Sequence, residues 1–497
     1  MGSPFRELLV LSGTKTTGGT AMIRGLDRRS FLELTVLGTT SLGLGRWGWT
    51  WQAPASKLIS PGCRRSKVKV ARLYLAGSGL WPHPKLDVEA ERQTYAQAFQ
   101  EMADQFADVD FFVDELITDP RQITALADQL AQADGILAIH LKMGVGGMLA
   151  EILKTGRPTM FFAVPYSGHE WAGFGTMLRQ EQPPLFDAIL SEDKRDLAAA
   201  VRPIRALHHL REAKIVNVTL RQPGEFHQAV KEKFGTEIKH IGLEPVVAAY
   251  EKVSDQEAEA EAQRWIEGAK QVVEPSREEI VRACKLALAF ERLLDEEDAT
   301  VLTVDCYGTM WDRTIKLPAY PCLGFSRLNS MGLGGICESD LRCAMTHIIF
   351  QGLAGKPGFI SDPTVDQSTN TIILAHCMGT VKMDGPNTPT MPYKIRCVLE
   401  RQEGVVPQVF MPVGQRATQA LFVDPNTLLY FTGEIVAAPD VERGCRTKIT
   451  VKVDGDVEKL WRNWTAGLHR STCLGDITKD LERFARLARM KLINELA

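Results

Sequence analysis

The chain has 497 residues, which is more than one ordinary hydrophobic core holds, and domains of about 100–200 residues would divide it into roughly two to four units. Hydrophobic residues make up 44% and charged residues 24%, a composition typical of globular proteins. The formal net charge of −3 excludes the basic excess by which proteins hold nucleic acid or an anionic membrane surface. No apolar run reaches the length of about 18 residues that a stable membrane span requires.

The ten cysteines form no Cys-x-x-Cys pair, which argues against a zinc ribbon and against a thioredoxin-like motif. Several of them, such as Cys306 and Cys397, stand in apolar, strand-like surroundings. We therefore predict that the cysteines are buried and act as small hydrophobic side chains.

The N-terminal segment has the pattern of an export signal. Arg28 and Arg29 precede Phe31 and Leu32, as in twin-arginine signals, and a short, mildly apolar stretch follows. Ala53-Pro54-Ala55 offers a small-residue cleavage site, so we predict that residues 1–55 are the signal. Its partner would be the twin-arginine (Tat) export machinery, and the mature chain would be periplasmic or extracytoplasmic.

The alternative is a chance Arg-Arg pair in a cytoplasmic protein. The pattern also leaves two start positions open, Met1 and Met22, because a shorter charged region before the twin arginines is the more usual arrangement.

Strands and helices alternate at the start of the mature chain. The apolar run 68–76 predicts a buried strand that ends at a glycine-rich loop. In chain order, we then expect a helix over 89–107, a strand over 109–113, a helix over 120–132, a strand over 135–140, a helix over 145–155 and a strand over 158–164. Such alternation indicates βαβ units and a parallel sheet, in a first domain over 67–200.

The pattern restarts at residue 214 and predicts a second α/β domain over 201–310. Its expected elements are a strand over 214–220, a helix over 224–235, two longer helices over 249–271 and 276–297, and a strand over 300–305.

After residue 310, Gly, Pro and Cys become frequent and the apolar runs become short, which predicts a mixed, strand-rich domain over 311–497. There we expect strands over 408–413, 428–432 and 446–453, and a closing amphipathic helix over 476–495.

Residues that can perform chemistry are densest over 325–378. Glu338 precedes a helix-like run over 341–350, and Asp362 ends the strand-like run 358–360 before a proline. Two carboxylates in one cleft repel each other unless a cation or a proton lies between them. Carboxylate oxygens with an imidazole suit Mn²⁺ or a similar hard divalent ion. Taken alone, however, the two acids also fit a helix start and an Asp-Pro turn.

Several segments carry a resemblance to a known family. They are Asn329, Cys337-Glu338-Ser339-Asp340, Thr346, Gly355-Lys356-Pro357, Ile360-Ser361-Asp362-Pro363, Ala375-His376-Cys377, Thr432-Gly433-Glu434, Gly444-Cys445-Arg446-Thr447, His469 and Gly475-Asp476. From about residue 299 to its end, the chain resembles the L-fucose isomerase and L-arabinose isomerase superfamily. Residues 133–136 and 156–159 resemble the N-terminal part of that family more loosely. The resemblance implies two Rossmann-like parallel-sheet domains followed by the mixed C-terminal domain.

The resemblance also implies a metal site. In that family a glutamate, an aspartate and a C-terminal histidine hold one Mn²⁺, and by position these are Glu338, Asp362 and His469. The arabinose branch adds a second histidine, for which His376 is the nearest candidate, as a ligand or as a substrate contact; the alternative is a satisfied histidine on an apolar strand. The implied activity is aldose–ketose isomerisation of an open-chain sugar through an ene-diol, with Glu338 and Asp362 as the catalytic pair.

Three further residues are candidate substrate contacts. Asn329 belongs to the resembling segments, and His169 and Trp171 follow the strand predicted over 158–164, at the end where open α/β sheets place ligands. The family resemblance implies that His169 and Trp171 reach the sugar across a subunit interface of a homo-oligomer.

Two other functions remain open, namely an exported sugar-binding protein without catalysis and a lapsed isomerase that keeps the site for structure. Metal content separates the first of these from the isomerase, because an isomerase requires a divalent ion that the Glu338→Gln variant loses. The sequence identifies neither the sugar, nor the metal, nor the number of subunits.

Overall fold

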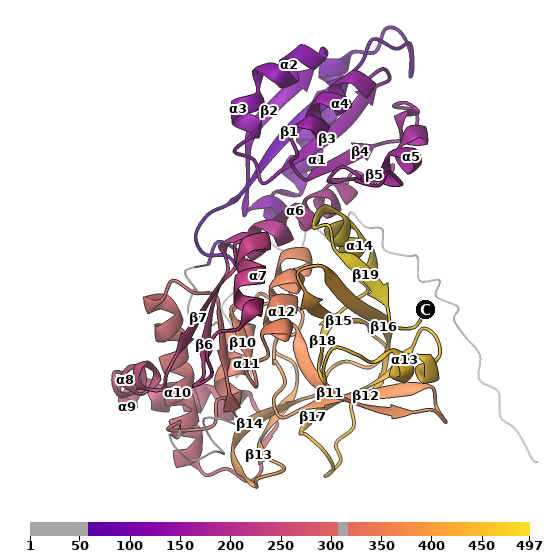
Figure 1. Ribbon diagram of the computed structural model, residues 1–497. Coiled ribbons are helices and arrows are strands. Elements are labelled where there is room, and N and C mark those ends of the chain that lie inside the picture. Colours follow the sequence, from indigo (N-terminus) through magenta and orange to yellow (C-terminus); the bar gives the residue numbers. More distant parts are fainter. Residues whose placement is uncertain (1–57, 307–316) are drawn as a thin grey trace, which may run out of the picture. The chain divides into compact units, whose positions relative to one another are not determined.

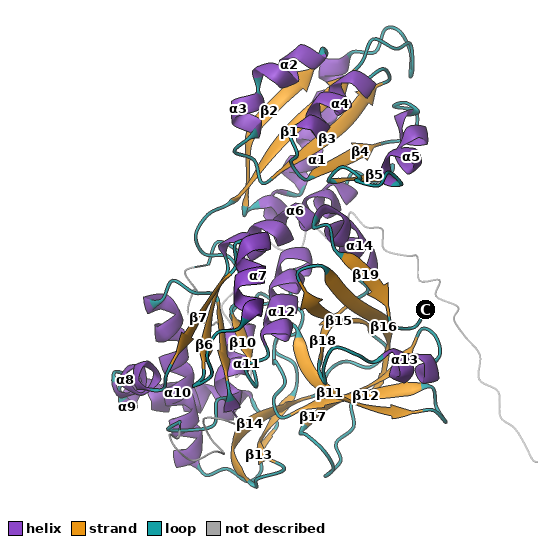
Figure 2. Cartoon of the chain, viewed as in Figure 1, coloured by secondary structure: helices purple, strands orange, loops and turns teal. Residues whose placement is uncertain are grey.

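The computed structural model describes residues 58–306 and 317–497 (Figure 1). The predicted export signal, residues 1–55, lies outside the described residues. Two parallel sheets are followed by a largely antiparallel one, which confirms an α/β protein with a strand-rich C-terminal part (Figure 2). Over the described ranges, no helix combines the length and the apolar character that crossing a membrane requires.

The first sheet has five parallel strands in the order β2-β1-β3-β4-β5. These strands are β1 Val68–Ala76, β2 Val109–Ile117, β3 Gly135–Lys142, β4 Thr159–Ala163 and β5 Phe186–Leu190. The helices around them are α1 Val88–Glu101, η1 Ala103–Phe106, α2 Pro120–Ala125, α3 Ala127–Leu130, α4 Gly146–Lys154, η2 Glu170–Gly173, α5 Phe174–Leu178 and α6 Asp196–Glu212.

Successive side chains of each strand point to opposite faces of this sheet, and both faces are buried. Val70 and Tyr74 of β1 belong to one apolar cluster with residues of α1 and α6. Ala71 and Leu73 belong to a second cluster with residues of α2, α3 and α4. Because both faces are covered, the strands are apolar almost throughout, as parallel strands usually are.

The second sheet has four parallel strands in the order β10-β9-β6-β7. These are β6 Lys214–Val218, β7 Glu237–Ile241, β9 Val301–Val304 and β10 Gly334–Ile336, so one edge strand comes from beyond residue 310. The helices in this part are α7 Glu225–Phe234, α8 Glu244–Glu251, α9 Asp255–Gly268, α10 Arg277–Glu296 and α11 Cys322–Ser330. The prediction of one helix over 249–271 is wrong, because Ser254 caps the start of α9 through Glu257 and separates it from α8.

The third sheet contains a closed barrel. Its strand order is β15-β18-β11-β12-β17-β16-β19, and β15 also pairs with β16, so that six strands form a ring. The strands are β11 Phe359–Asp366, β12 Thr371–His376, β15 Arg416–Asp424, β16 Thr427–Ala437, β17 Thr447–Val453, β18 Arg470–Leu474 and β19 Lys491–Asn494. A smaller sheet joins β8 Gln271–Val272, β13 Tyr393–Val398 and β14 Glu403–Val409, and α13 covers Val457–Asn463.

The end of the chain differs from the prediction of a single helix over 476–495. Helix α14 covers only Thr478–Leu487, and it buries Leu481 and Phe484 as the apolar spacing predicts. Arg489 then has a positive φ of 49°, which ends the helical path. The last residues form β19, which pairs in parallel with β16, so the available edge of the barrel sheet overrides the helical pattern.

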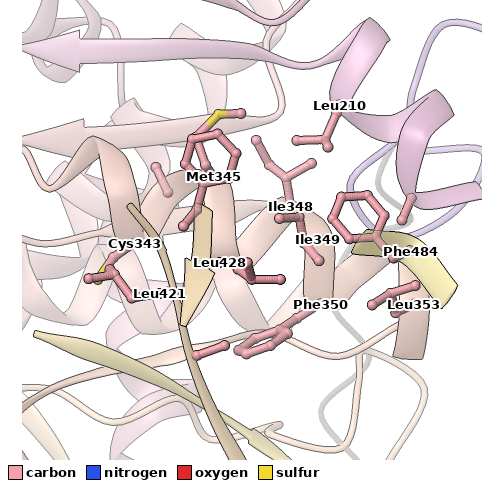
Figure 3. Close-up of a cluster of buried hydrophobic side chains, with 14 of the residues drawn as sticks. Leu210, Cys343, Met345, Ile348, Ile349, Phe350, Leu353, Leu421, Leu428 and Phe484 are labelled. Atoms are coloured by element: carbon pink, nitrogen blue, oxygen red, sulfur yellow. The ribbon is translucent and has the colours of Figure 1, made fainter. Parts of the chain in front are cut away.

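Helix α12, Leu341–Ala354, lies at the centre of the largest apolar cluster (Figure 3). Its Met345, Ile348 and Ile349 are fully buried. Around them lie Leu210 of α6, Leu421 of β15, Leu428 of β16 and Phe484 of α14. Burial of each large apolar side chain contributes about 1.5–3 kcal/mol, so the position of α12, and of the loop before it, is strongly determined.

A buried charged network fixes α6 to the first sheet. The Nδ1 atom of His208 lies 2.8 Å from Oδ2 of Asp134, and its Nε2 lies 3.5 Å from Oε2 of Glu212. Arg211 also pairs with Asp134. Burial alone would lower the pKa of His208, but hydrogen bonds with Asp134, Cys63 and Glu212 outweigh it and raise that pKa to about 11.

We predict that this network makes stability fall at alkaline pH. A histidine whose pKa is raised on folding stabilises the fold fully below its unfolded pKa of about 6.5, and that contribution is lost as the pH rises toward about 11. Calorimetric unfolding between about pH 6 and pH 10 should show that the free energy of unfolding falls less in the His208→Asn variant than in the wild type.

The neighbouring His209 provides the matched control. Burial lowers its pKa to about 3, so it stays neutral over this range, and the His209→Asn variant should keep the pH dependence of the wild type. If the free energy of unfolding falls equally with pH in the wild type and in the His208→Asn variant, the assignment of a charged His208 is wrong.

Candidate metal centre

Glu338 is presented on a strained loop between β10 and α12. Glu338 has φ 63° and Ser339 has φ 53°, which places two consecutive non-glycine residues in the left-handed region. The Ser339 N–H donates to the carbonyl of Val304 at 2.9 Å, and its hydroxyl donates to Oδ1 of Asn217 at 2.5 Å. Each such conformation costs about 1–3 kcal/mol, and residues held in this way cluster at functional sites.

The barrel presents the other candidate ligands from three adjacent strands. Asp362 lies in β11, opposite Ala375 of β12, and His376 is the last residue of β12. His469 directly precedes β18, which pairs with β11 on its other side. The prediction that Asp362 ends its strand is wrong, because β11 continues through Pro363 to Asp366 in register with β12.

The structure brings Asp362, His469 and His376 together, and Glu338 approaches both histidines. The Nε2 atom of His469 lies 3.2 Å from Oδ1 of Asp362 and 3.6 Å from Oε2 of Glu338. The Nε2 atom of His376 lies 3.6 Å from the other oxygen of Glu338. One ligand atom each from Asp362, His376 and His469 lies within 4.8 Å of the other two. Glu338, Asp362 and His376 line a cavity of about 30 Å³, which has room for one ion or a water molecule.

Asp340 orients His469, a role that sequence reasoning did not assign to it. Its Oδ2 lies 2.9 Å from Nδ1 of His469, and its Oδ1 accepts a hydrogen bond from the Cys343 N–H at 2.8 Å as the N-cap of α12. Histidines that bind metals usually have their second ring nitrogen held by a carboxylate in this way. The sequence signals for Asp340 are its place in the resembling segment 337–340 and its position before an apolar helix, which by itself indicates no more than a cap.

The pKa values of His469, Asp340 and Asp362 depend on one another. Burial alone would lower the pKa of His469, but the carboxylates of Asp340 and Asp362 outweigh it and raise that pKa to about 10. Burial alone would raise the pKa values of Asp340 and Asp362, but His469 holds both below their usual range. A divalent ion bound here would take over the role of the proton on His469, because imidazole binds a metal in its neutral form.

The unpartnered atoms of the site fit a metal ion. Nε2 of His469 and both ring nitrogens of His376 are buried and have no hydrogen-bond partner within the described residues. A buried polar group without a partner costs about 1–3 kcal/mol, which makes such atoms uncommon. Two carboxylates and two imidazoles in such proximity form a donor set suited to Mn²⁺ and similar ions.

The remaining candidates lie elsewhere. Asn329 is buried in α11, where its amide donates to the Gly335 carbonyl and the Thr380 hydroxyl and accepts from the Gly335 N–H, so it holds β10 in place. His169 and Trp171 follow β4 in the first sheet. The His169 ring lies 4.9 Å from the ring of Trp81, and Trp171 is 52% exposed. Over the described ranges, neither His169 nor Trp171 contacts the four ligands.

Sequence reasoning missed the convergence of the cysteines. Five of them line the cavity beside the carboxylates, namely Cys306, Cys322, Cys337, Cys377 and Cys445. Cys306, Cys322 and Cys337 are buried, as predicted, whereas Cys377 and Cys445 are only half-buried, and all five are gathered in one place. The available signal was that Cys337 adjoins Glu338 and Cys377 adjoins His376.

No protein-family model matches the chain, and no curated protein matches it in sequence. The function therefore has to be inferred from the residues of the site.

We predict that Asp340→Asn weakens metal binding without unfolding the protein. Asparagine caps a helix about as well as aspartate, so α12 should persist, whereas the negative partner of His469 is lost. The loss of such a partner lowers metal affinity by about 10- to 100-fold, which calorimetric titration with Mn²⁺ would measure.

The control is Asp456→Asn, which changes the N-cap of α13 in the same way, since Asp456 accepts from the Glu458 N–H at 2.8 Å. Its Mn²⁺ affinity should equal that of the wild type. Unchanged affinity in Asp340→Asn would contradict the orienting role of Asp340.

Proposed function

We propose that the chain is a metal-dependent aldose–ketose isomerase that acts on an open-chain sugar through an ene-diol. Glu338, Asp362 and His469 are the ligands of Mn²⁺ or another divalent cation, and His376 completes the set. The observation that carries the proposal is the convergence of two carboxylates with two buried imidazoles whose Nε2 atoms have no hydrogen-bond partner among the described residues.

The chemistry divides between the ion and the protein. When bound, the ion supplies Lewis-acid stabilisation of the charge that develops on the sugar oxygens O1 and O2. Glu338 and Asp362 move the proton between C1 and C2, a transfer that a positioned carboxylate typically accelerates about 10²- to 10⁴-fold. The low pKa of Asp362 keeps it ionised, the form that accepts a proton. Asp340 keeps the imidazole of His469 in one orientation.

The lining of the cavity favours an uncharged substrate. Among the described residues it carries the carboxylates of Glu338, Asp362 and Glu400 but no Lys or Arg. Recognition of a phosphate or carboxylate group usually requires such cations, and Arg in particular. A volume of about 30 Å³ holds an ion and not a whole sugar, so the sugar lies across the opening with O1 and O2 directed inward.

The wider proposal follows the family resemblance. The two parallel sheets are Rossmann-like domains, and the protein is a homo-oligomer in which His169 and Trp171 approach the sugar bound by a neighbouring subunit. The chain is exported folded through the twin-arginine route, which allows the metal to be loaded before export. Loading before export favours Mn²⁺, because an exposed oxygen and nitrogen site otherwise prefers Cu²⁺ or Zn²⁺.

The test is a screen of unphosphorylated aldoses and ketoses with Mn²⁺-loaded protein, in which interconversion is followed by chromatography. We expect turnover of at least one sugar, and a loss of about 10²-fold or more in kcat for both Glu338→Gln and Asp362→Asn. Circular dichroism should show that both variants remain folded, and Asp456→Asn should retain full activity.

If metal-loaded wild-type protein turns over no sugar in the screen, the proposal fails. Sugar affinity that survives chelation would then identify an exported sugar-binding protein instead.

A further inference from the structure

The thiols that line the cavity come from segments far apart in the sequence. Cys306 follows β9 by two residues, Cys322 begins α11, and Cys337 directly follows β10. Cys377 directly follows β12, and Cys445 precedes β17 by two residues. All five line the same small space as Glu338, Asp362 and His376. A core needs no such gathering of thiols, because cysteines that act only as small hydrophobes can be spread through it.

The distances fit a shared ion. The Sγ atoms of Cys306 and Cys337 are 3.4 Å apart. A disulfide requires about 2.05 Å, whereas two thiolates on one tetrahedral ion, each at about 2.3 Å, are separated by about 3.8 Å. One ligand atom each from Cys337, Glu338 and His376 lies within 4.8 Å of the other two. On the other side of the space, Sγ of Cys445 lies 3.9 Å from Oδ2 of Asp362.

His376 supplies an independent indication. Its side chain is 1% exposed, neither ring nitrogen has a hydrogen-bond partner within the described residues, and the residue lines this cavity. Nε2 lies 3.6 Å from Oε1 of Glu338, and a ring nitrogen of His376 lies within 4.8 Å of the Cys337 Sγ atom. Thiolate with imidazole is a softer donor set than the oxygens of the neighbouring carboxylate site, and it suits Zn²⁺ and its heavier congener Cd²⁺.

We propose that the Cys337 side of this cavity is a thiolate site for a soft or borderline divalent ion such as Zn²⁺ or Cd²⁺, held in place of the hard ion. Cys337 is its sulfur ligand, His376 is its nitrogen ligand and Glu338 supplies an oxygen, while the Cys306 thiol adjoins Cys337. Binding of one ion displaces the proton of the Cys337 thiol to solvent and involves no oxidation. The site depends on the thiol and requires no sugar chemistry. Because it shares His376 and Glu338 with the oxygen-rich site, the two ions compete for these ligands.

The test is titration of the full chain, reduced and freed of metal, with Cd²⁺ alone while ultraviolet absorption is recorded. We expect a sulfur-to-cadmium charge-transfer band that saturates at one ion per chain. The band should be lost in Cys337→Ser and require about tenfold more Cd²⁺ in Cys306→Ser. It should be unchanged in Cys284→Ala, which removes a buried thiol of α10 that does not line the cavity.

The two metal sites are distinguishable by variants. Asp362→Asn should lose Mn²⁺ affinity and keep the cadmium band, whereas Cys337→Ser should lose the band and still bind Mn²⁺, which also shows that it is folded. Cadmium NMR of the wild type, which needs no variant, should show a resonance typical of sulfur and nitrogen ligands. An oxygen-only resonance, an unchanged band in Cys337→Ser, or a Cys306–Cys337 disulfide found by mass spectrometry would overturn the proposal.

Discussion

The imidazole of His469 lies between the carboxylates of Asp340 and Asp362, with an oxygen of Glu338 3.6 Å from its Nε2 atom. Three acids in such proximity repel one another unless positive charge lies among them, and that requirement explains the raised pKa of His469 and the lowered pKa values of Asp340 and Asp362. A proton on His469 supplies the charge. A divalent cation would supply more of it and would also engage the nitrogens that have no hydrogen-bond partner among the described residues.

The fold holds these groups together from two directions. On one side, pairing of β11 with both β12 and β18 fixes Asp362, His376 and His469 on neighbouring strands of a closed barrel. On the other side, the apolar contacts of α12 fix the loop that carries Glu338 and Asp340, and these contacts are strong enough to sustain two left-handed residues in that loop (Figure 3). Because α12 packs against the barrel strands β15 and β16, the two directions belong to one core.

The sequence allowed the long, strongly patterned elements to be predicted, such as the buried strand β1, helix α10 and the helix that follows Glu338. It did not reveal short strands whose existence depends on a partner, such as β10 beside β9 or β19 beside β16. The candidate ligands Glu338, Asp362 and His469, and His376 as a ligand or substrate contact, were predicted through a family resemblance and not from spacing. Their proximity depends on strand register in the barrel, and so does the gathering of five thiols, because neither is encoded in local periodicity.

The most direct test of the central claim is a crystal structure of the protein grown with Mn²⁺, with diffraction data collected on both sides of the manganese absorption edge. We expect one anomalous peak within bonding distance of Glu338, Asp362 and the Nε2 atom of His469, at about 2.0–2.3 Å from the nitrogen. If no anomalous peak appears between these residues at full Mn²⁺ saturation, or if manganese is found only elsewhere on the chain, the assignment of this metal site is wrong.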